Sequence, residues 1–195
     1  MSRTSSTLLR LVLILAALTI TATASFADTV TFTGDTTGRP TYNRTLAGEP
    51  PTGLSLVGTA VRYTLTQLTV SASGSYVFQS IAAYDNFTSL YINSFNPAAP
   101  LTNALVSNDD NPSVGMSGFT ISLTAGTNYF FINTSFANSN FGAYTSTITG
   151  PGTITIGGAP GAVPEPATLL LLGTGLTGLA AKVRQRRKAR QSTDV

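Results

Sequence analysis

The chain has 195 residues, a length that suits one ordinary domain plus processing segments. It contains no cysteine, histidine or tryptophan, which excludes a disulfide framework, a serine–histidine nucleophile and the commonest zinc ligand. The formal net charge is +3, but eight of the eleven basic residues lie outside residues 28–162, where three arginines face six carboxylates. That middle part has a net charge of −3, which argues against a nucleic-acid partner because phosphate binding needs basic side chains.

The N-terminus has the parts of a secretory signal peptide. Residues 1–27 contain Arg3 and Arg10, an apolar run, and then small residues that end at Ala27. This order predicts export, with cleavage between Ala27 and Asp28. The alternative is an uncleaved membrane anchor, which we favour less because the apolar run is shorter than the roughly 20 residues that span a bilayer.

Residues 28–156 show the alternation of apolar and polar side chains that is typical of half-buried strands. In GFTISLTAG, for example, Phe119, Ile121 and Leu123 share one face. Turn residues separate about eight or nine such runs, and none of them has the pattern of an amphipathic helix. The sequence therefore predicts an all-β fold, a single antiparallel β-sandwich of about eight or nine strands, flanked by an N-terminal signal helix and a C-terminal hydrophobic helix.

Some stretches depart from simple alternation. Residues 129–132 are apolar on both faces, which predicts a central strand packed on both sides. The apolar phase changes near Thr66 and Gln67, so we expect a bulge or a break there. Residues 38–53 hold three prolines, which predicts an edge crossing or a long loop. Residues 157–162 have the glycine and proline content of a linker.

The C-terminus combines three features in one order. An uncharged, leucine-rich segment at residues 167–181 precedes six basic residues at 182–190, and both follow Val163, Pro164, Glu165 and Pro166. The prolines disfavour a helix before the apolar segment, so Glu165 would be presented in extended chain at the membrane surface. The basic tail would stay in the cytoplasm, because lysine and arginine resist translocation.

This arrangement over residues 163–190 resembles the PEP-CTERM sorting signal of Gram-negative bacteria. The resemblance implies that an exosortase, a membrane-embedded processing enzyme, recognises Val163, Pro164, Glu165 and Pro166 and removes the tail. It also implies a protein that crosses the cytoplasmic membrane, is anchored there transiently, and goes on to the outer envelope or the extracellular space, with exopolysaccharide as a candidate partner. The alternative is a plain C-terminal anchor with an incidental Pro-Glu-Pro, which we favour less because all three features occur in order.

A weaker resemblance concerns residues 60–150. The runs GSYVFQ, YDNFTSLYI, NALVSNDDNPS, FTISLTAGTNYFFI and GAYTSTITG follow one another there. This series is similar to the bacterial pre-peptidase C-terminal domain, a small β-sandwich of secreted enzymes and surface proteins. Two departures stand beside it: four residues separate Asp85 from Leu90, and no protease domain accompanies the module.

The loop SNDDNPS offers oxygen ligands of the kind that calcium takes. They come from Asn108, Asp109 and Asp110, and Asp85 is a further candidate. The spacing is not that of an EF-hand, and we favour an Asx turn capped by its own side chains. The sequence therefore assigns no catalytic residue, no cofactor and no metal, with calcium at these four positions kept as the alternative.

Three functions remain open from the sequence. The one that we favour is an exported surface or matrix protein whose non-catalytic sandwich associates with exopolysaccharide. The second is a carbohydrate-binding module, with or without calcium, although most aromatic residues on strands are expected to be core. The third is a glycosidase, which would need two carboxylates from among Glu49, Asp85, Asp109 and Asp110. We favour it least and predict that the chain is not an enzyme.

Overall fold

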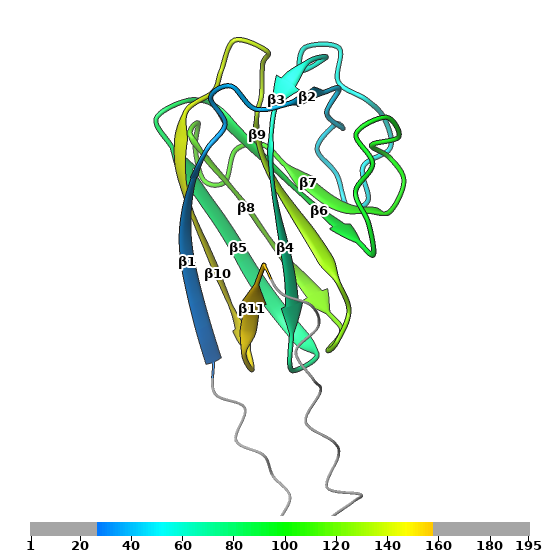
Figure 1. The fold of residues 1–195 in the computed structure, drawn as a ribbon, viewed down its shortest axis with the longest axis vertical. Helices are drawn as coiled ribbons and strands as arrows, with labels where there is room; N and C mark the ends of the chain where they lie inside the picture. Colours follow the sequence, from blue (N-terminus) through cyan, green and yellow to red (C-terminus); the bar gives the residue numbers. More distant parts are fainter. Residues whose placement is uncertain (1–26, 158–195) are drawn as a thin grey trace, which may run out of the picture.

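A computed structural model of the protein describes residues 27–157, and every regular element within them is a β-strand. Two large antiparallel sheets pack face to face, with a two-stranded ribbon beside them (Figure 1). The strands are β1 (Ala27–Asp35), β2 (Thr41–Tyr42), β3 (Val61–Arg62), β4 (Thr64–Val70), β5 (Gly74–Ala82), β6 (Asn86–Ile92), β7 (Ala104–Asn108), β8 (Met116–Leu123), β9 (Tyr129–Ser135), β10 (Ala143–Pro151) and β11 (Ile154–Ile156). The predicted all-β antiparallel fold is confirmed, whereas the two predicted flanking helices lie outside the described residues.

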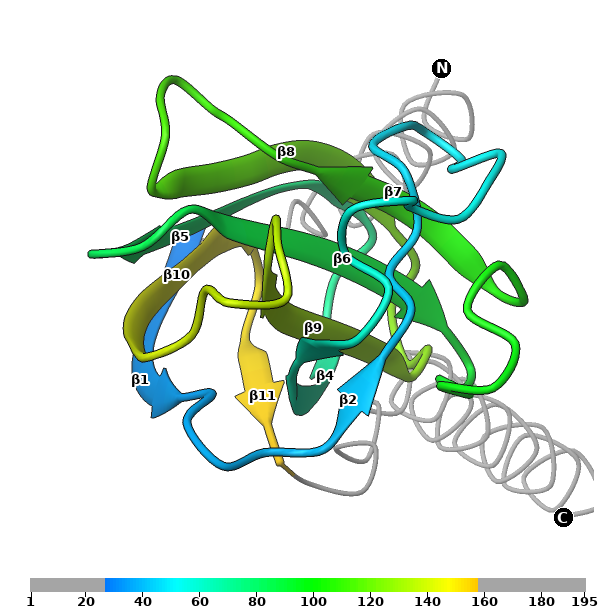
Figure 2. The same cartoon turned by 90° about the horizontal axis from the view of Figure 1, so that it is seen from above.

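The two sheets form the layers of a sandwich, which Figure 2 shows from above. One sheet has the strand order β1-β10-β5-β8, and the other has the order β11-β4-β9-β6-β7. The two sheets therefore contain nine strands, in agreement with the predicted eight or nine. The ribbon is the pair β2 and β3, in which Thr41 faces Arg62.

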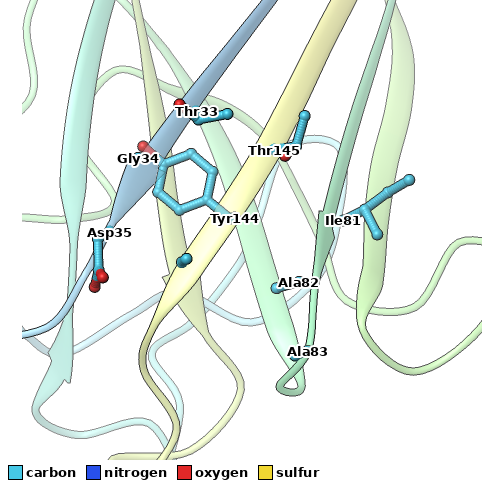
Figure 3. Close-up of a pocket in the computed structure, with 9 residues that line it drawn as sticks. Thr33, Gly34, Asp35, Ile81, Ala82, Ala83, Tyr144 and Thr145 are labelled. Carbon is cyan, nitrogen blue, oxygen red and sulfur yellow. The ribbon is translucent and has the colours of Figure 1, made fainter.

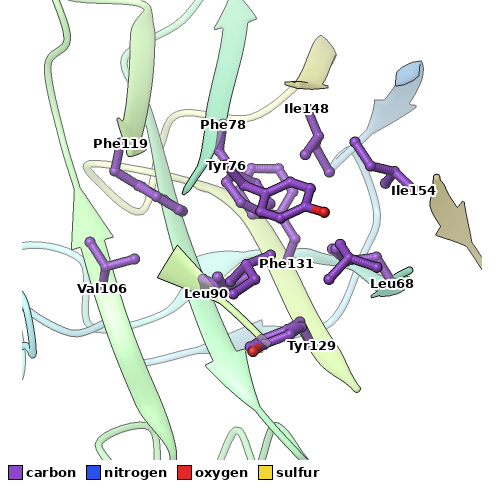
Figure 4. Close-up of a cluster of buried hydrophobic side chains, with 12 residues drawn as sticks. Leu68, Tyr76, Phe78, Leu90, Val106, Phe119, Tyr129, Phe131, Ile148 and Ile154 are labelled. Atoms are coloured by element: carbon purple, nitrogen blue, oxygen red, sulfur yellow. The ribbon is translucent and has the colours of Figure 1, made fainter. Parts of the chain in front are cut away.

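The main core lies between the two sheets and is built from alternating residues of both (Figure 4). Phe78 of β5 packs against Phe119 of β8 with 5.0 Å between ring centroids, and against Phe131 of β9 at 5.2 Å. Phe119 and Leu123 are both buried, and Ile121 is packed against the same cluster, as the alternation in this segment predicts. Period-two alternation thus places one apolar face of each sheet inward.

The outer face of the five-stranded sheet is covered as well. The segment that contains the β2–β3 ribbon lies over it, and a second apolar cluster joins Tyr42 and Val61 to Tyr91 and Ile132. Strand β9 therefore contributes Phe131 to the inner core and Ile132 to the outer one. This arrangement confirms the prediction of a central strand buried on both faces.

The prediction of a bulge or a break near Thr66 and Gln67 is wrong. Strand β4 pairs with β9 without a shift from Thr64 to Leu68, and the alternation of faces continues through it. Val61 faces the outer cluster, whereas Leu68 faces the core between the two sheets. The apolar residues therefore change from one face to the other because the outer face is covered near Val61 and the inner face is covered near Leu68. A register shift does occur between β6 and β7, at Leu90 and Tyr91.

The described chain begins and ends near the same end of the sandwich, the lower part of Figure 1. Ala27 pairs with Pro151, and the Ile154 amide donates to a carboxylate oxygen of Asp28 at 2.9 Å. The connections after β1, β5, β7 and β9 lie at the opposite end. No helix within residues 27–157 is long and apolar enough to cross a bilayer.

Candidate functional site

Three aspartates from two connections meet at the end of the sandwich away from Ala27. Asp85 lies in the turn between β5 and β6, and Asp109 and Asp110 directly follow β7. One carboxylate oxygen from each residue lies within 4.8 Å of the other two. Asp85 and Asp109 are half-buried, and Asp110 is exposed. We call these three residues the aspartate cluster.

The asparagines of the same loop have a different role. The side-chain oxygen of Asn108 accepts from the Gly118 amide at 3.2 Å, and the Asn111 side-chain amide donates to the Gly118 carbonyl at 2.8 Å. These two side chains therefore tie the loop to β8, as in a self-capped turn. The structure brings together three of the four sequence candidates for a cation and uses the fourth, Asn108, to hold the loop.

Burial and mutual repulsion disfavour charge on the aspartate cluster. The pKa of Asp109 is raised to about 6, first by burial and then by the neighbouring Asp110 and Asp85, whereas Arg44 opposes the shift. The pKa of Asp85 is also raised, first by burial and then by Asp110. One oxygen each of Asp85 and Asp109 is buried without a hydrogen-bond partner among the described residues. The cluster therefore favours a proton or a cation over three free negative charges.

Arg44 is the cation that opposes the raised pKa values of Asp85 and Asp109. Its own contacts, however, are mainly with groups outside the aspartate cluster. Its side chain is 2% exposed, and its guanidinium lies 4.2 Å from the ring centroid of Phe87 and 4.5 Å from that of Phe136. It donates to the backbone oxygens of Phe136 and Thr45, both at 2.9 Å. Sequence reasoning missed this residue, because a single arginine in a polar loop carries no signal of burial.

The chemistry of the cluster fits a hard cation better than hydrolysis. Calcium takes six to eight oxygen ligands, so backbone carbonyls or water would have to complete a site built on three carboxylates. The cluster oxygens lie within 4.8 Å of one another, so one cation can contact all three carboxylates. Glu49, the fourth carboxylate considered for catalysis, is not among them.

A second polar feature lies between the two sheets, where β1 faces β4. A hollow of about 380 Å³ is lined by residues 32–35 of β1, by residues 63–66, and by Arg39, Pro40 and Tyr144. A neighbouring hollow of about 590 Å³ lies on the outer face of β1, β10 and β5 (Figure 3). Both hollows share residues 33–35 and Tyr144. We call the first hollow the β1–β4 groove.

Tyr144 joins the two sheets at this position. It pairs with Gly34 across β10 and β1, and its ring occupies the space that a side chain at Gly34 would need. Its hydroxyl bonds the Thr64 hydroxyl at 2.6 Å. Position 34 therefore requires glycine, because the Tyr144 ring lies against its backbone. Tyr144 and Thr64 together close the groove on its inner side.

Most of the aromatic side chains that could stack against a sugar belong to the core instead. Tyr76, Phe87, Tyr91, Tyr129, Phe131 and Tyr144 are buried. Phe141 is 40% exposed, but the Arg62 guanidinium lies 4.0 Å from its ring centroid. Tyr63, which the sequence did not single out, is half-buried and lines the β1–β4 groove.

The C-terminal motif is established by comparison. Residues 162–187 match the model of the PEP-CTERM protein-sorting motif. The predicted sorting signal is therefore confirmed, and the chain carries the motif of exported proteins that an exosortase sorts. The matched residues lie outside the part that the structure describes. No curated protein matches the chain, and the resemblance of residues 60–150 to the pre-peptidase C-terminal domain stays a prediction.

Solved structures share only a distant similarity with the sandwich. The periplasmic inhibitor of g-type lysozyme PliG from Aeromonas hydrophila aligns at a TM-score of 0.39 and 9% identity, over 69% of this chain and 90% of its own. A family 35 carbohydrate-binding module from an environmental isolate aligns at 0.35 and 17%, over 68% and 99%. The K1 cleaved adhesin domain of Lys-gingipain from Porphyromonas gingivalis W83 aligns at 0.35 and 16%, over 68% and 99%. Similarity at this level assigns no function to the chain.

Proposed function

We propose that this protein is an exosortase substrate that is exported, held briefly at the cytoplasmic membrane by its C-terminal segment, and released to the outer envelope or extracellular matrix. Its β-sandwich is non-catalytic and associates with exopolysaccharide. The observation that carries this proposal is the sorting motif at residues 162–187. The boundaries that go with it are a signal peptide at 1–27, a sandwich at 28–156, a linker at 157–162 and a sorting signal at 163–190.

The topology is compatible with presentation of the sandwich from its C-terminal side. The first and last described residues lie near one end of the sandwich, and the aspartate cluster lies at the other (Figure 1). A protein retained by its C-terminal segment would therefore direct the connections after β1, β5, β7 and β9 away from the point of attachment.

The composition supports a non-catalytic role. Without histidine or cysteine, the whole chain lacks the usual general base and thiol nucleophile. The oxygens of the three carboxylates that meet lie within 4.8 Å of one another, a spacing that suits a shared cation or proton. Polymer association then depends on a binding surface and not on a reaction.

Mass spectrometry of the mature protein from its native host tests the sorting part of the proposal. We expect the chain to begin at Asp28 and to lack residues 182–190. The variant Glu165→Gln should keep its basic tail and accumulate in the cytoplasmic membrane, whereas the control Glu49→Gln, which changes the only other glutamate, should be processed normally. Recovery of wild-type protein that still ends at Val195 would contradict the proposal.

A calcium-dependent carbohydrate-binding module is the second candidate, and the aspartate cluster favours it. Two of its carboxylate oxygens are buried without a hydrogen-bond partner within residues 27–157, and bound calcium would neutralise the two carboxylates. Calcium should then raise the melting temperature of the wild type and leave Asp109→Asn much less affected. Equal melting curves of the wild type in calcium and in chelator would exclude this candidate and leave the first one standing.

A further inference from the structure

We infer that the β1–β4 groove is the saccharide-binding site of the sandwich, and that its ligand is a segment of acidic exopolysaccharide whose carboxylate is bound by Arg39. This inference rests on the proposed association with exopolysaccharide and names the surface and the ligand class for it.

The groove exists because two strand edges are left open opposite each other. Strand β1 pairs only with β10. Strand β4 pairs with β11 only from Leu68 to Val70, and the Gly157 amide bonds the Gln67 carbonyl just beyond. Residues 64–66 therefore have no strand partner from residues 27–157 on the side that faces β1. The resulting hollow of about 380 Å³ lies within the size range of small-ligand sites.

The groove lining has the groups that bind sugars. Thr33, Thr66 and the open backbone edges supply donors and acceptors for sugar hydroxyls. Tyr63 supplies a half-buried ring, held by edge contacts to Tyr42 and Phe95 with 5.0 and 5.2 Å between centroids. A ring fixed in this way loses little conformational entropy when a sugar binds beside it.

Arg39 gives the groove one basic group that can bind the carboxylate of an acidic sugar. Its side chain is exposed, and its one hydrogen bond among the described residues runs from Nε to the Asp35 backbone oxygen at 3.3 Å. The other two arginines of residues 27–157 are engaged by aromatic rings: Arg44 is buried between Phe87 and Phe136, and Arg62 lies over Phe141. The remaining donors of Arg39 are thus available for a bidentate carboxylate contact.

Asp35 complements Arg39 on the same wall of the groove. One of its carboxylate oxygens accepts from the Thr37 amide at 2.7 Å, which fixes the side chain. The Asp35 carboxylate also interacts with the Thr37 side chain, and its oxygens can accept from sugar hydroxyls at the groove surface. A ligand that carries both hydroxyls and a carboxylate, as a uronic acid does, would use both side chains.

The neighbouring hollow favours a polymer over a single sugar. It shares Gly34, Asp35 and Tyr144 with the groove and continues onto the outer face of the four-stranded sheet (Figure 3). A polymer can therefore pass over the end of β1 and contact both hollows. The open part of β4 spans only residues 64–66, fewer than an ordinary strand of about five or six, so an extended peptide would have to pair with the edge of β1 instead.

Binding to defined polymers tests the inference. The full-length protein in detergent is titrated with alginate, a polymer of uronic acids, and with dextran, which is neutral, by affinity electrophoresis and calorimetry. We expect alginate to bind and dextran to bind weakly or not at all. Arg39→Gln should weaken alginate binding about tenfold or more, since a charge-assisted contact contributes about 1.5–3 kcal/mol. The matched control Arg62→Gln should bind as the wild type does.

The outcomes separate the site from the function. Unchanged binding by Arg39→Gln with a wild-type melting curve, or equal weakening by Arg62→Gln, overturns the groove as the site while polymer association stands. Equal affinity for dextran overturns the acidic ligand. A correctly processed protein that binds neither these polymers nor the host's own exopolymer would contradict both the inference and the proposed association.

Discussion

Asp109→Asn is expected to stabilise the protein at neutral pH, which is unusual for a substitution in a half-buried position. Asparagine has nearly the same size as aspartate, so the packing of the loop after β7 should be kept. The change removes one of three carboxylates whose oxygens lie within 4.8 Å of one another. The asparagine side chain can also donate a hydrogen bond to Asp85 or Asp110, which the carboxylate cannot do.

The size of the effect follows from the pKa of Asp109. The folded state raises this pKa from the usual 3.8 to about 6, a difference of roughly 3 kcal/mol at most, which solvent screening of a half-buried group reduces to about 1–2 kcal/mol. Because the folded state holds the proton more tightly than the unfolded state, the free energy of unfolding falls as the pH rises from about 4 to about 6. Above that window the full penalty is present in the wild type and absent in Asp109→Asn.

Thermal melting of the full-length protein in detergent and chelator checks this reasoning. At pH 7.5 Asp109→Asn should melt about 3–8 °C above the wild type, and at pH 4.5 the difference should nearly vanish. Asp35→Asn is the control, because Asp35 is exposed and its pKa is lowered rather than raised. A variant that melts below the wild type at pH 7.5 would refute the claim that charge repulsion dominates the cluster.

Three further substitutions test the packing. Phe131→Ala removes a fully buried ring from the central strand and should cost about 3–5 kcal/mol in chemical denaturation, against about 0.5 kcal/mol or less for the exposed Val77→Ala; similar losses would contradict the assignment of faces. Gly34→Ala should cost about 1–3 kcal/mol by displacing the Tyr144 ring, and a neutral result would place that ring elsewhere. Arg44→Ala should cost about 2–4 kcal/mol by removing a side chain stacked between two rings; a loss that high salt abolishes would indicate a surface ion pair instead.

Much of the sandwich could be predicted because its signal is local. The period-two alternation around Phe119 and Leu123 reports a strand with one buried face, and the doubly apolar run at residues 129–132 reports a central strand. The same reasoning failed at Thr66 and Gln67, because it assumed that β4 has a single buried face. The cover over the outer face comes from the ribbon near Tyr42, and nothing in the sequence of β4 reports a distant segment.

The sequence alone determined the sorting motif, the class of fold and the absence of histidine and cysteine chemistry, because each of these depends on residues that are close together or on composition. The tertiary structure decided which side chains meet. Asp85 reaches Asp109 and Asp110 only because the turn after β5 and the loop after β7 lie at the same end of the sandwich. Likewise, the groove between Thr33 and Thr66 depends on β11 ending after three residues, and the burial of Arg44 depends on one ring from β6 and one from the connection after β9. Contacts of this kind, between residues far apart in the sequence, are set by strand order and register. The alternation of apolar and polar residues along one strand does not encode either of them.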